Sequence, residues 1–143
     1  MGEARRVMDA MTDATLQSDL EAAADLYAPD AVIVTPDQGE LRGREQIVAY
    51  LKEINDAFPD NSYEPAYKHE SGDTAIDEGY FVGTNTAPLS LPTGESAPAT
   101  GKAVRVRICD IATVQNGVIT NHRFYFDQVD LLGQLGLLPE TPS

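Results

Sequence analysis

Apolar residues recur every three or four positions in the first part of the chain, which is the spacing of an amphipathic helix. Residues 3–16 carry one such stripe and are predicted to form the first helix. A stronger stripe, ended by Pro59, predicts a further helix, and its members are Ile47, Tyr50, Leu51, Ile54 and Phe58.

A helix start signal lies between these two stripes. In the segment Ser18-Asp19-Leu20-Glu21, the side chains of Ser18 and Glu21 fit a capping box. A second helix is therefore expected to begin here and to stop before Pro29. Its inward positions are predicted to be Leu20, Ala23, Ala24 and Tyr27.

The period changes to two in the rest of the chain, which predicts β-strands. They are expected at Ala31–Thr35, Tyr63–His69, Thr74–Thr86, Val104–Val114 and Val118–Phe126, with a turn at Gly39–Gly43. Residues 87–103 are rich in Pro, Gly, Ser and Thr and predict a long loop of the kind that covers binding sites. A short closing helix is expected around Leu131, Leu132 and Leu135.

Helices followed by an antiparallel meander are typical of the α+β class. We expect the N-terminal helices to pack on one face of a strongly curved sheet, around a single and mostly apolar pocket. The length of 143 residues suits one domain, residues 1–143, with a flexible C-terminal tail at 138–143.

The hairpin Val104–Phe126 permits two strand registers. A two-residue Asn116-Gly117 loop would place Asp110 opposite Arg123, whereas a three-residue loop with a bulge would place Asp110 opposite His122. The three-residue loop brings the two most apolar strand faces together, and facing patterns fix register. We therefore predict that Asp110 and His122 face each other on the inner side of the sheet.

An Asp–His pair on an apolar face is a candidate for acid–base chemistry. Burial disfavours a charged carboxyl group, and a neighbouring imidazolium favours it. Such a pair could remove a proton from a weakly acidic C–H group, or donate a hydrogen bond to a developing enolate. The alternative is a structural hydrogen bond that stabilises the core, and the sequence leaves both interpretations open.

The net charge and the cysteine content limit the kinds of partner and the cellular compartment that we expect. With 23 acidic and 10 basic residues the net charge is −13, which argues against nucleic acid and anionic membranes. The single cysteine allows no intrachain disulfide, and we find neither a signal-peptide pattern nor an apolar run long enough to span a membrane. A cytoplasmic protein is expected. Histidines at ligand spacing and glycine-rich phosphate loops are missing, so no metal and no cofactor are predicted.

Four aromatic residues are predicted to lie on inner faces: Tyr27, Tyr50, Phe124 and Phe126. Each can pack in the core or form the wall of a pocket that binds a ring compound. The acidic residues Asp73, Asp77 and Glu78 predict a solvated edge, although Glu78 would point inward if the phase of its strand differed.

Several segments, in this order, resemble the SnoaL-like polyketide cyclases. They are Leu26-Tyr27-Ala28-Pro29-Asp30-Ala31, Gly83-Thr84-Asn85-Thr86, Thr100-Gly101-Lys102, Asn116-Gly117-Val118-Ile119 and Asp127-Gln128. These cyclases belong to the nuclear-transport-factor-2-like superfamily, which has a cystatin-like fold and includes ketosteroid isomerase. The resemblance implies a cone-shaped α+β barrel with a pocket between sheet and helices, and a homodimer.

The resemblance also implies roles for individual residues. The aspartic acid of the oxyanion hole in ketosteroid isomerase falls on Asp110, but the general base falls on Thr35, which cannot act as a base. The acid–base aspartate of cyclases falls on Phe124, and Asn85 stands where the cyclases commonly have a histidine.

These observations favour an enzyme that works without a cofactor on a small hydrophobic metabolite. The predicted substrate is an apolar, carbonyl-bearing compound of secondary metabolism, similar to a polyketide, and the reaction is a cyclisation or isomerisation. Asp110 and His122 are predicted to be catalytic, and the substrate-binding residues are predicted to be Phe124, Phe126, Tyr27, Asn85 and Tyr50. The alternative is a protein that binds a hydrophobic ligand without transforming it.

Overall fold

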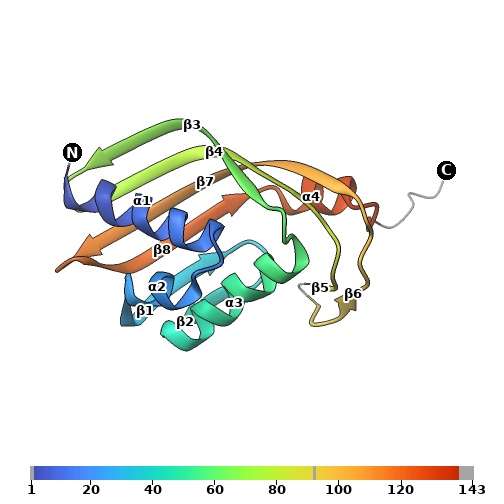
Figure 1. Ribbon diagram of the computed structural model, residues 1–143, viewed down its shortest axis with the longest axis horizontal. Helices are drawn as coiled ribbons and strands as arrows, with labels where there is room; N and C mark the ends of the chain where they lie inside the picture. The colour runs from blue at the N-terminus through green and yellow to red at the C-terminus, as the bar shows by residue number, and fades with distance from the viewer. Residues whose placement is uncertain (1, 92, 139–143) are drawn as a thin grey trace.

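The computed structural model describes residues 2–91 and 93–138 of the chain. Its centre is a six-stranded sheet with the strand order β2-β1-β8-β7-β4-β3. The helices α1 (Glu3–Leu16), α2 (Leu20–Asp25) and α3 (Arg44–Ala57) lie together over one face of this sheet (Figure 1). The α+β class predicted from the pattern of elements is therefore confirmed, with α1 and α3 at the predicted positions.

The second helix differs from the prediction at both ends. Asp19 is its N-cap, because the Asp19 carboxylate accepts a hydrogen bond of 3.1 Å from the backbone N–H of Ala22. Ser18 instead takes a left-handed backbone conformation with φ of 56°, so the predicted capping box is wrong. The helix ends at Asp25, and Tyr27 begins a strand instead of lying on a helix face.

That strand, β1 (Tyr27–Thr35), changes the topology of the sheet. It pairs in parallel with β8 (Val118–Phe126), while its other edge pairs with β2 (Gly39–Arg42). The segment predicted as a turn is thus largely an edge strand, and the sheet is mixed instead of a pure antiparallel meander. The other strands, β3 (Ser62–Ser71), β4 (Thr74–Thr84) and β7 (Ala103–Gln115), match the predicted ranges within a few residues.

The β7–β8 hairpin follows neither predicted register along its whole length. Gln115 pairs with Val118 around a two-residue Asn116-Gly117 turn, and both turn residues have positive φ. A bulge at Thr120 then adds one residue to β8, so that Asp110 lies opposite Phe124 and His122 opposite Ala112. Asp110 and His122 are therefore diagonal neighbours on the same inner face, not the directly opposed pair that we predicted.

The loop 87–103 contains a short hairpin, β5 (Leu89–Ser90) paired with β6 (Ser96–Ala97). Helix α4 (Gln128–Gln134) follows β8 and packs on β7. Most of the predicted flexible tail 138–143 lies outside the described residues. Among the described helices, none combines the length and the apolar composition that a membrane crossing requires.

The N-terminus of helix α1 is hydrogen-bonded to the sheet. The carboxylate of Glu70 on β3 accepts hydrogen bonds from the backbone N–H groups of Gly2 and Arg5, each of 2.9 Å. These two bonds satisfy donors at the start of the helix and lower the pKa of Glu70. The helix is thereby held over β3 and β4, where it closes one side of the site described next.

Candidate functional site

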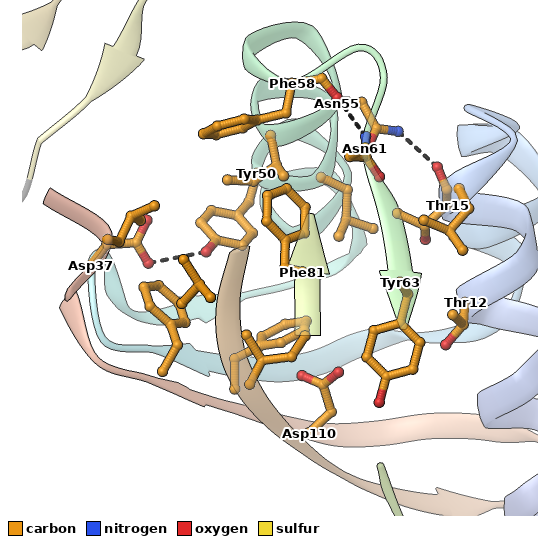
Figure 2. A pocket seen from close by; sticks show the side chains of 18 of the residues that line it. Thr12, Thr15, Asp37, Tyr50, Asn55, Phe58, Asn61, Tyr63, Phe81 and Asp110 are labelled. Carbon is orange, nitrogen blue, oxygen red and sulfur yellow. Dashed lines mark hydrogen bonds between the residues drawn. The ribbon is translucent and has the colours of Figure 1, made fainter. Parts of the chain in front are cut away.

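A cavity of about 160 Å³ lies between the sheet and helices α1 and α3. Its walls come from both apolar clusters of the core, with Met11 and Leu51 from one and Phe58, Leu89 and Val106 from the other. Figure 2 shows side chains from the helices and the sheet converging on this space. Six aromatic rings line it: Tyr50, Phe58, Tyr63, Phe81, Phe124 and Phe126.

A row of buried polar side chains crosses four adjacent strands behind the cavity. Asp77 on β4 lies opposite Asp110 on β7 in the strand register. His122 lies on the next strand, β8, and Tyr27 on β1. Their exposed fractions are 2%, 8%, 0% and 0%. Of these four, Asp110 lines the cavity, and the other three lie behind its wall.

His122 is oriented by Tyr27. The Tyr27 hydroxyl lies 2.8 Å from His122 Nδ1, and His122 Nε2 lies 3.7 Å from Asp110 Oδ1, beyond hydrogen-bond length. If the hydroxyl donates to Nδ1, the ring proton resides on Nε2 and faces the carboxyl oxygen. The other tautomer would direct an Nε2 lone pair at that oxygen and deprive the buried hydroxyl proton of an acceptor. We therefore assign the proton to Nε2.

The inner end of the cavity contains polar atoms without partners. Among the described residues, Asp110 Oδ1 and the Tyr63 hydroxyl are both buried and make no hydrogen bond. Figure 2 shows the Asp110 carboxyl group and the Tyr63 ring side by side at this end. Burial, followed by the charges of Asp77 and Asp110, raises the pKa of Tyr63, so its hydroxyl remains a proton donor.

A glycine provides the room for Tyr63. A Cβ atom at Gly79 would lie 2.6 Å from the Tyr63 hydroxyl, closer than such atoms approach. Because Gly79 has no side chain, the tyrosine ring can lie across the inner face of β4. The same Cβ atom would lie 2.3 Å from the backbone carbonyl oxygen of Glu64, so a substitution Gly79→Ala would shift the β3 backbone together with the ring.

The other end of the cavity contains a second carboxyl group. Asp37, in the turn between β1 and β2, accepts a hydrogen bond of 3.0 Å from the Tyr50 hydroxyl on α3 (Figure 2). The Tyr50 ring also packs against Phe124, with ring centroids 6.3 Å apart. Burial, followed by the charge of Asp37, raises the pKa of Tyr50.

Asp77 is paired with a buried cation. Its Oδ1 lies 2.5 Å from the Arg5 guanidinium, whose side chain is 9% exposed. Arg5 also bonds Asp9 at 2.9 Å, and it donates to the carbonyl oxygens of His69 and Ile76. Burial raises the pKa of Asp77 in spite of this pairing. The prediction of a solvated edge is thus wrong for Asp77.

The predicted site residues separate into two groups. Asp110, Phe124, Phe126 and Tyr50 line the cavity, whereas His122, Tyr27 and Asn85 do not. His122 and Tyr27 lie behind Asp110 and can act only through it.

Asn85 lies at the base of the 87–103 loop. Its amide donates to the carbonyl oxygen of Ala87 and accepts from the backbone N–H of Thr100, so it holds the two ends of the loop together. The loop itself contributes Leu89 and Ser90 to the cavity wall, and the Ser90 N–H donates to Glu53 on α3 at 2.8 Å.

Sequence reasoning missed Asp37 and Tyr63. Asp37 lies in a turn, where periodicity carries no information about direction. Tyr63 is the second residue of β3, and all other residues of that strand are exposed, so the alternation of β3 gives no inward face. The one usable signal is Gly79, because a glycine inside a strand often marks the close approach of another group.

Three tyrosines with raised pKa values predict a loss of stability at alkaline pH. Burial raises the pKa of Tyr27, Tyr50 and Tyr63 above the ordinary value of about 10. The folded state therefore keeps protons that the unfolded chain releases, and stability should fall as pH rises past about 10. In a phenolate absorbance titration, we expect three of the six tyrosines to ionise only on unfolding. Ionisation of all six in a chain that keeps its native circular dichroism would contradict this.

The family model of the SnoaL-like domain matches residues 4–122. The chain belongs to the SnoaL-like family. The search of the curated proteins finds no significant match to it.

Solved structures with the same fold cover nearly the whole chain. A proposed SnoaL-like polyketide cyclase from Jannaschia sp. CCS1 superimposes with a TM-score of 0.84 at 16% identity, covering 96% of this chain and 94% of that one. IdmH, a proposed polyketide cyclase from Streptomyces antibioticus, has a TM-score of 0.77 at 24% identity, with 94% and 99% covered. An LEH-like epoxide hydrolase from Mycobacterium tuberculosis has a TM-score of 0.71 at 19% identity, with 93% of this chain and 89% of that one covered. At these identities the likeness establishes the nuclear-transport-factor-2-like fold, as the resemblance implied.

Proposed function

We propose that this SnoaL-like protein is a cofactor-independent enzyme that removes a proton next to a carbonyl group of an apolar ring compound. The observation that carries the proposal is the Asp110 carboxyl group and the Tyr63 hydroxyl, two groups of the cavity lining that have no hydrogen-bond partner among the described residues. A buried polar atom without a partner is costly, and a ligand that completes its hydrogen bonds removes that cost.

The two groups suit the two ends of an enolisation. The Tyr63 hydroxyl donates a hydrogen bond to the carbonyl oxygen, which gains negative charge as the enolate forms. The Asp110 carboxylate accepts the proton from the adjacent carbon, and the C–H electron pair moves toward the carbonyl oxygen. Returning the proton to another carbon gives an isomerisation. Attack of the enolate carbon on a second carbonyl carbon, with the proton returned from Asp110 to the oxygen of that carbonyl, gives a cyclisation.

His122 and Tyr27 act as positioning residues in this mechanism. The Nε2–H of His122 faces the Asp110 carboxyl group, while Tyr27 fixes the imidazole through Nδ1. Phe124 packs on His122 with ring centroids 4.0 Å apart and forms the wall on the cavity side. A planar substrate can stack on this wall with its reactive carbon toward Asp110.

Two of the structural relatives support this choice, because they are described as proposed polyketide cyclases. Polyketides carry the carbonyl-flanked carbons that this site would deprotonate, and secondary metabolism is the context that we propose. The natural substrate would be larger than the test compounds below, and the loop 87–103 would cover it.

The proposal is tested by exchange of α-hydrogens for deuterium in 2-tetralone and related cyclic ketones, followed by NMR in D₂O. The protein is expected to accelerate exchange over buffer and over an equal concentration of heat-denatured protein. Binding of 2-naphthol, a mimic of the enolate, without exchange in any ketone would overturn catalysis. That result would favour the alternative of a hydrophobic-ligand-binding protein.

Tyr63→Phe tests the assigned donor. Loss of one hydrogen bond to a developing oxyanion costs about a hundredfold in rate, so exchange should slow by about that factor. The ring remains in place, and the melting temperature should not fall because the hydroxyl has no partner in the folded protein. An unchanged exchange rate would remove Tyr63 from the mechanism.

A further inference from the structure

The charged side chains among the described residues of the cavity wall are all acidic. Among the described residues that line the cavity, the ionisable groups besides tyrosine are Asp37 and Asp110, and no lysine, arginine or histidine faces the space. Arg5 is turned away toward Asp77 and Asp9, and the His122 ring lies behind the wall. The whole chain adds to this negative field with a net charge of −13.

The Asp37 carboxylate can accept a further hydrogen bond. Its carboxylate accepts one hydrogen bond from Tyr50, and a carboxylate has about four acceptor positions. Among the described ion pairs and hydrogen bonds, no basic side chain reaches it. An additional donor that enters the cavity can therefore bind Asp37 without displacing a protein group.

The aromatic walls suit a cation better than a neutral donor. Tyr50 lies between Asp37 and Phe124, and six rings in total surround the cavity. The faces of aromatic rings carry partial negative charge and attract ammonium groups, whereas they offer no comparable attraction to a neutral hydroxyl. A protonated amine next to Asp37 would thus gain both an ionic hydrogen bond and contacts with ring faces.

We propose that the ligand of this cavity is a carbonyl-bearing ring compound that also carries a protonated amine, bound by Asp37 and Tyr50 at the end opposite Asp110. This inference rests on the proposed function for the carbonyl end and adds the class of substrate. It explains why a cavity with apolar walls contains carboxyl groups at both ends.

Binding of three naphthalene compounds of one shape tests the charge preference: 2-naphthylmethylammonium, 2-naphthylmethanol and 2-naphthoate. Naphthalene fluorescence reports binding against a low background because the chain has no tryptophan. We expect the ammonium compound to bind about tenfold more tightly than the alcohol, and the carboxylate to bind weakest. Equal affinity for the ammonium and the alcohol would overturn the inference.

Asp37→Asn assigns the preference to a residue. Asparagine keeps the shape and can still accept from Tyr50, so the fold should be preserved, which circular dichroism checks. The tenfold advantage of the ammonium compound should disappear in Asp37→Asn and persist in Asp13→Asn, an exposed carboxylate on α1. Loss of the advantage in both variants, or in neither, would contradict the role of Asp37.

The two proposals fail separately. Exchange of 2-tetralone hydrogens depends on Asp110 and needs no amine, so its absence would overturn the proposed reaction while leaving the ammonium preference testable. Conversely, exchange with no ammonium preference would retain the reaction and remove the amine from the substrate class.

Discussion

Asp110→Asn is expected to abolish nearly all catalysed hydrogen exchange in 2-tetralone. A positioned general base contributes about 10²- to 10⁴-fold to the rate, and asparagine cannot accept the proton. The substitution is nearly isosteric at a residue that makes no hydrogen bond through its buried Oδ1. Exchange should therefore fall by about a thousandfold, with binding of 2-naphthol largely retained.

The control for this prediction is Asp13→Asn, which removes the same charge from an exposed position on α1. It should exchange 2-tetralone at the wild-type rate. If Asp110→Asn retains more than a tenth of the wild-type rate while remaining folded, Asp110 is not the base. A fall of equal size in both variants would indicate a general effect of charge.

Arg5→Met is expected to destabilise the protein more than any other single substitution considered. Methionine retains most of the apolar stem but leaves the Asp77 carboxyl, 2% exposed, without its cation. Breaking a buried ion pair by removing one partner costs about 3–5 kcal/mol of unfolding free energy. Urea unfolding monitored by circular dichroism gives this value from the shift in midpoint at constant slope.

The pH dependence of this stability difference shows whether the unpaired Asp77 charge causes it. The pKa of Asp77 is already raised by burial, and loss of Arg5 should raise it further. A raised carboxyl pKa means that the folded state is stabilised by the proton at low pH and loses that stabilisation as pH rises. The difference in stability between wild type and Arg5→Met should therefore shrink on acidification. A difference that does not depend on pH would indicate lost packing instead.

Two comparisons complete this test. Adding Asp77→Asn to Arg5→Met removes the unpaired charge and should recover a large part of the lost stability. Lys52→Met breaks an exposed ion pair with Asp56, whose side chains are 63% and 59% exposed, and should cost less than about 1 kcal/mol. Equal losses in Arg5→Met and Lys52→Met would show that burial does not matter here.

The inner face of β7 was predictable because its alternation is uninterrupted from Val104 to Val114. The predicted partner of Asp110 was wrong because the bulge lies at Thr120 within β8 instead of in the turn. A shift of two residues along a strand preserves the face of every side chain. Asp110 and His122 therefore share the predicted face even though their opposite residues differ.

Other parts of the site depend on contacts that are distant in sequence. Asp77 also alternates inward with Ala75, but its burial requires Arg5, more than seventy positions earlier. Tyr27 was assigned to a helix because its spacing from Ala23 is helical, whereas pairing with β8 makes it a strand residue. Periodicity reports the face of an element once its type is known, and tertiary pairing can override the type.

The most direct test of the central claim is the crystal structure of the protein with 2-naphthol bound. The account predicts that the ring stacks in the cavity against Phe124 and that its oxygen lies within hydrogen-bond distance of the Tyr63 hydroxyl, beside the Asp110 carboxyl group. An oxygen directed at Asp37 with the ring reversed, or a naphthol bound outside the cavity, would contradict the claim that Asp110 and Tyr63 form the carbonyl site.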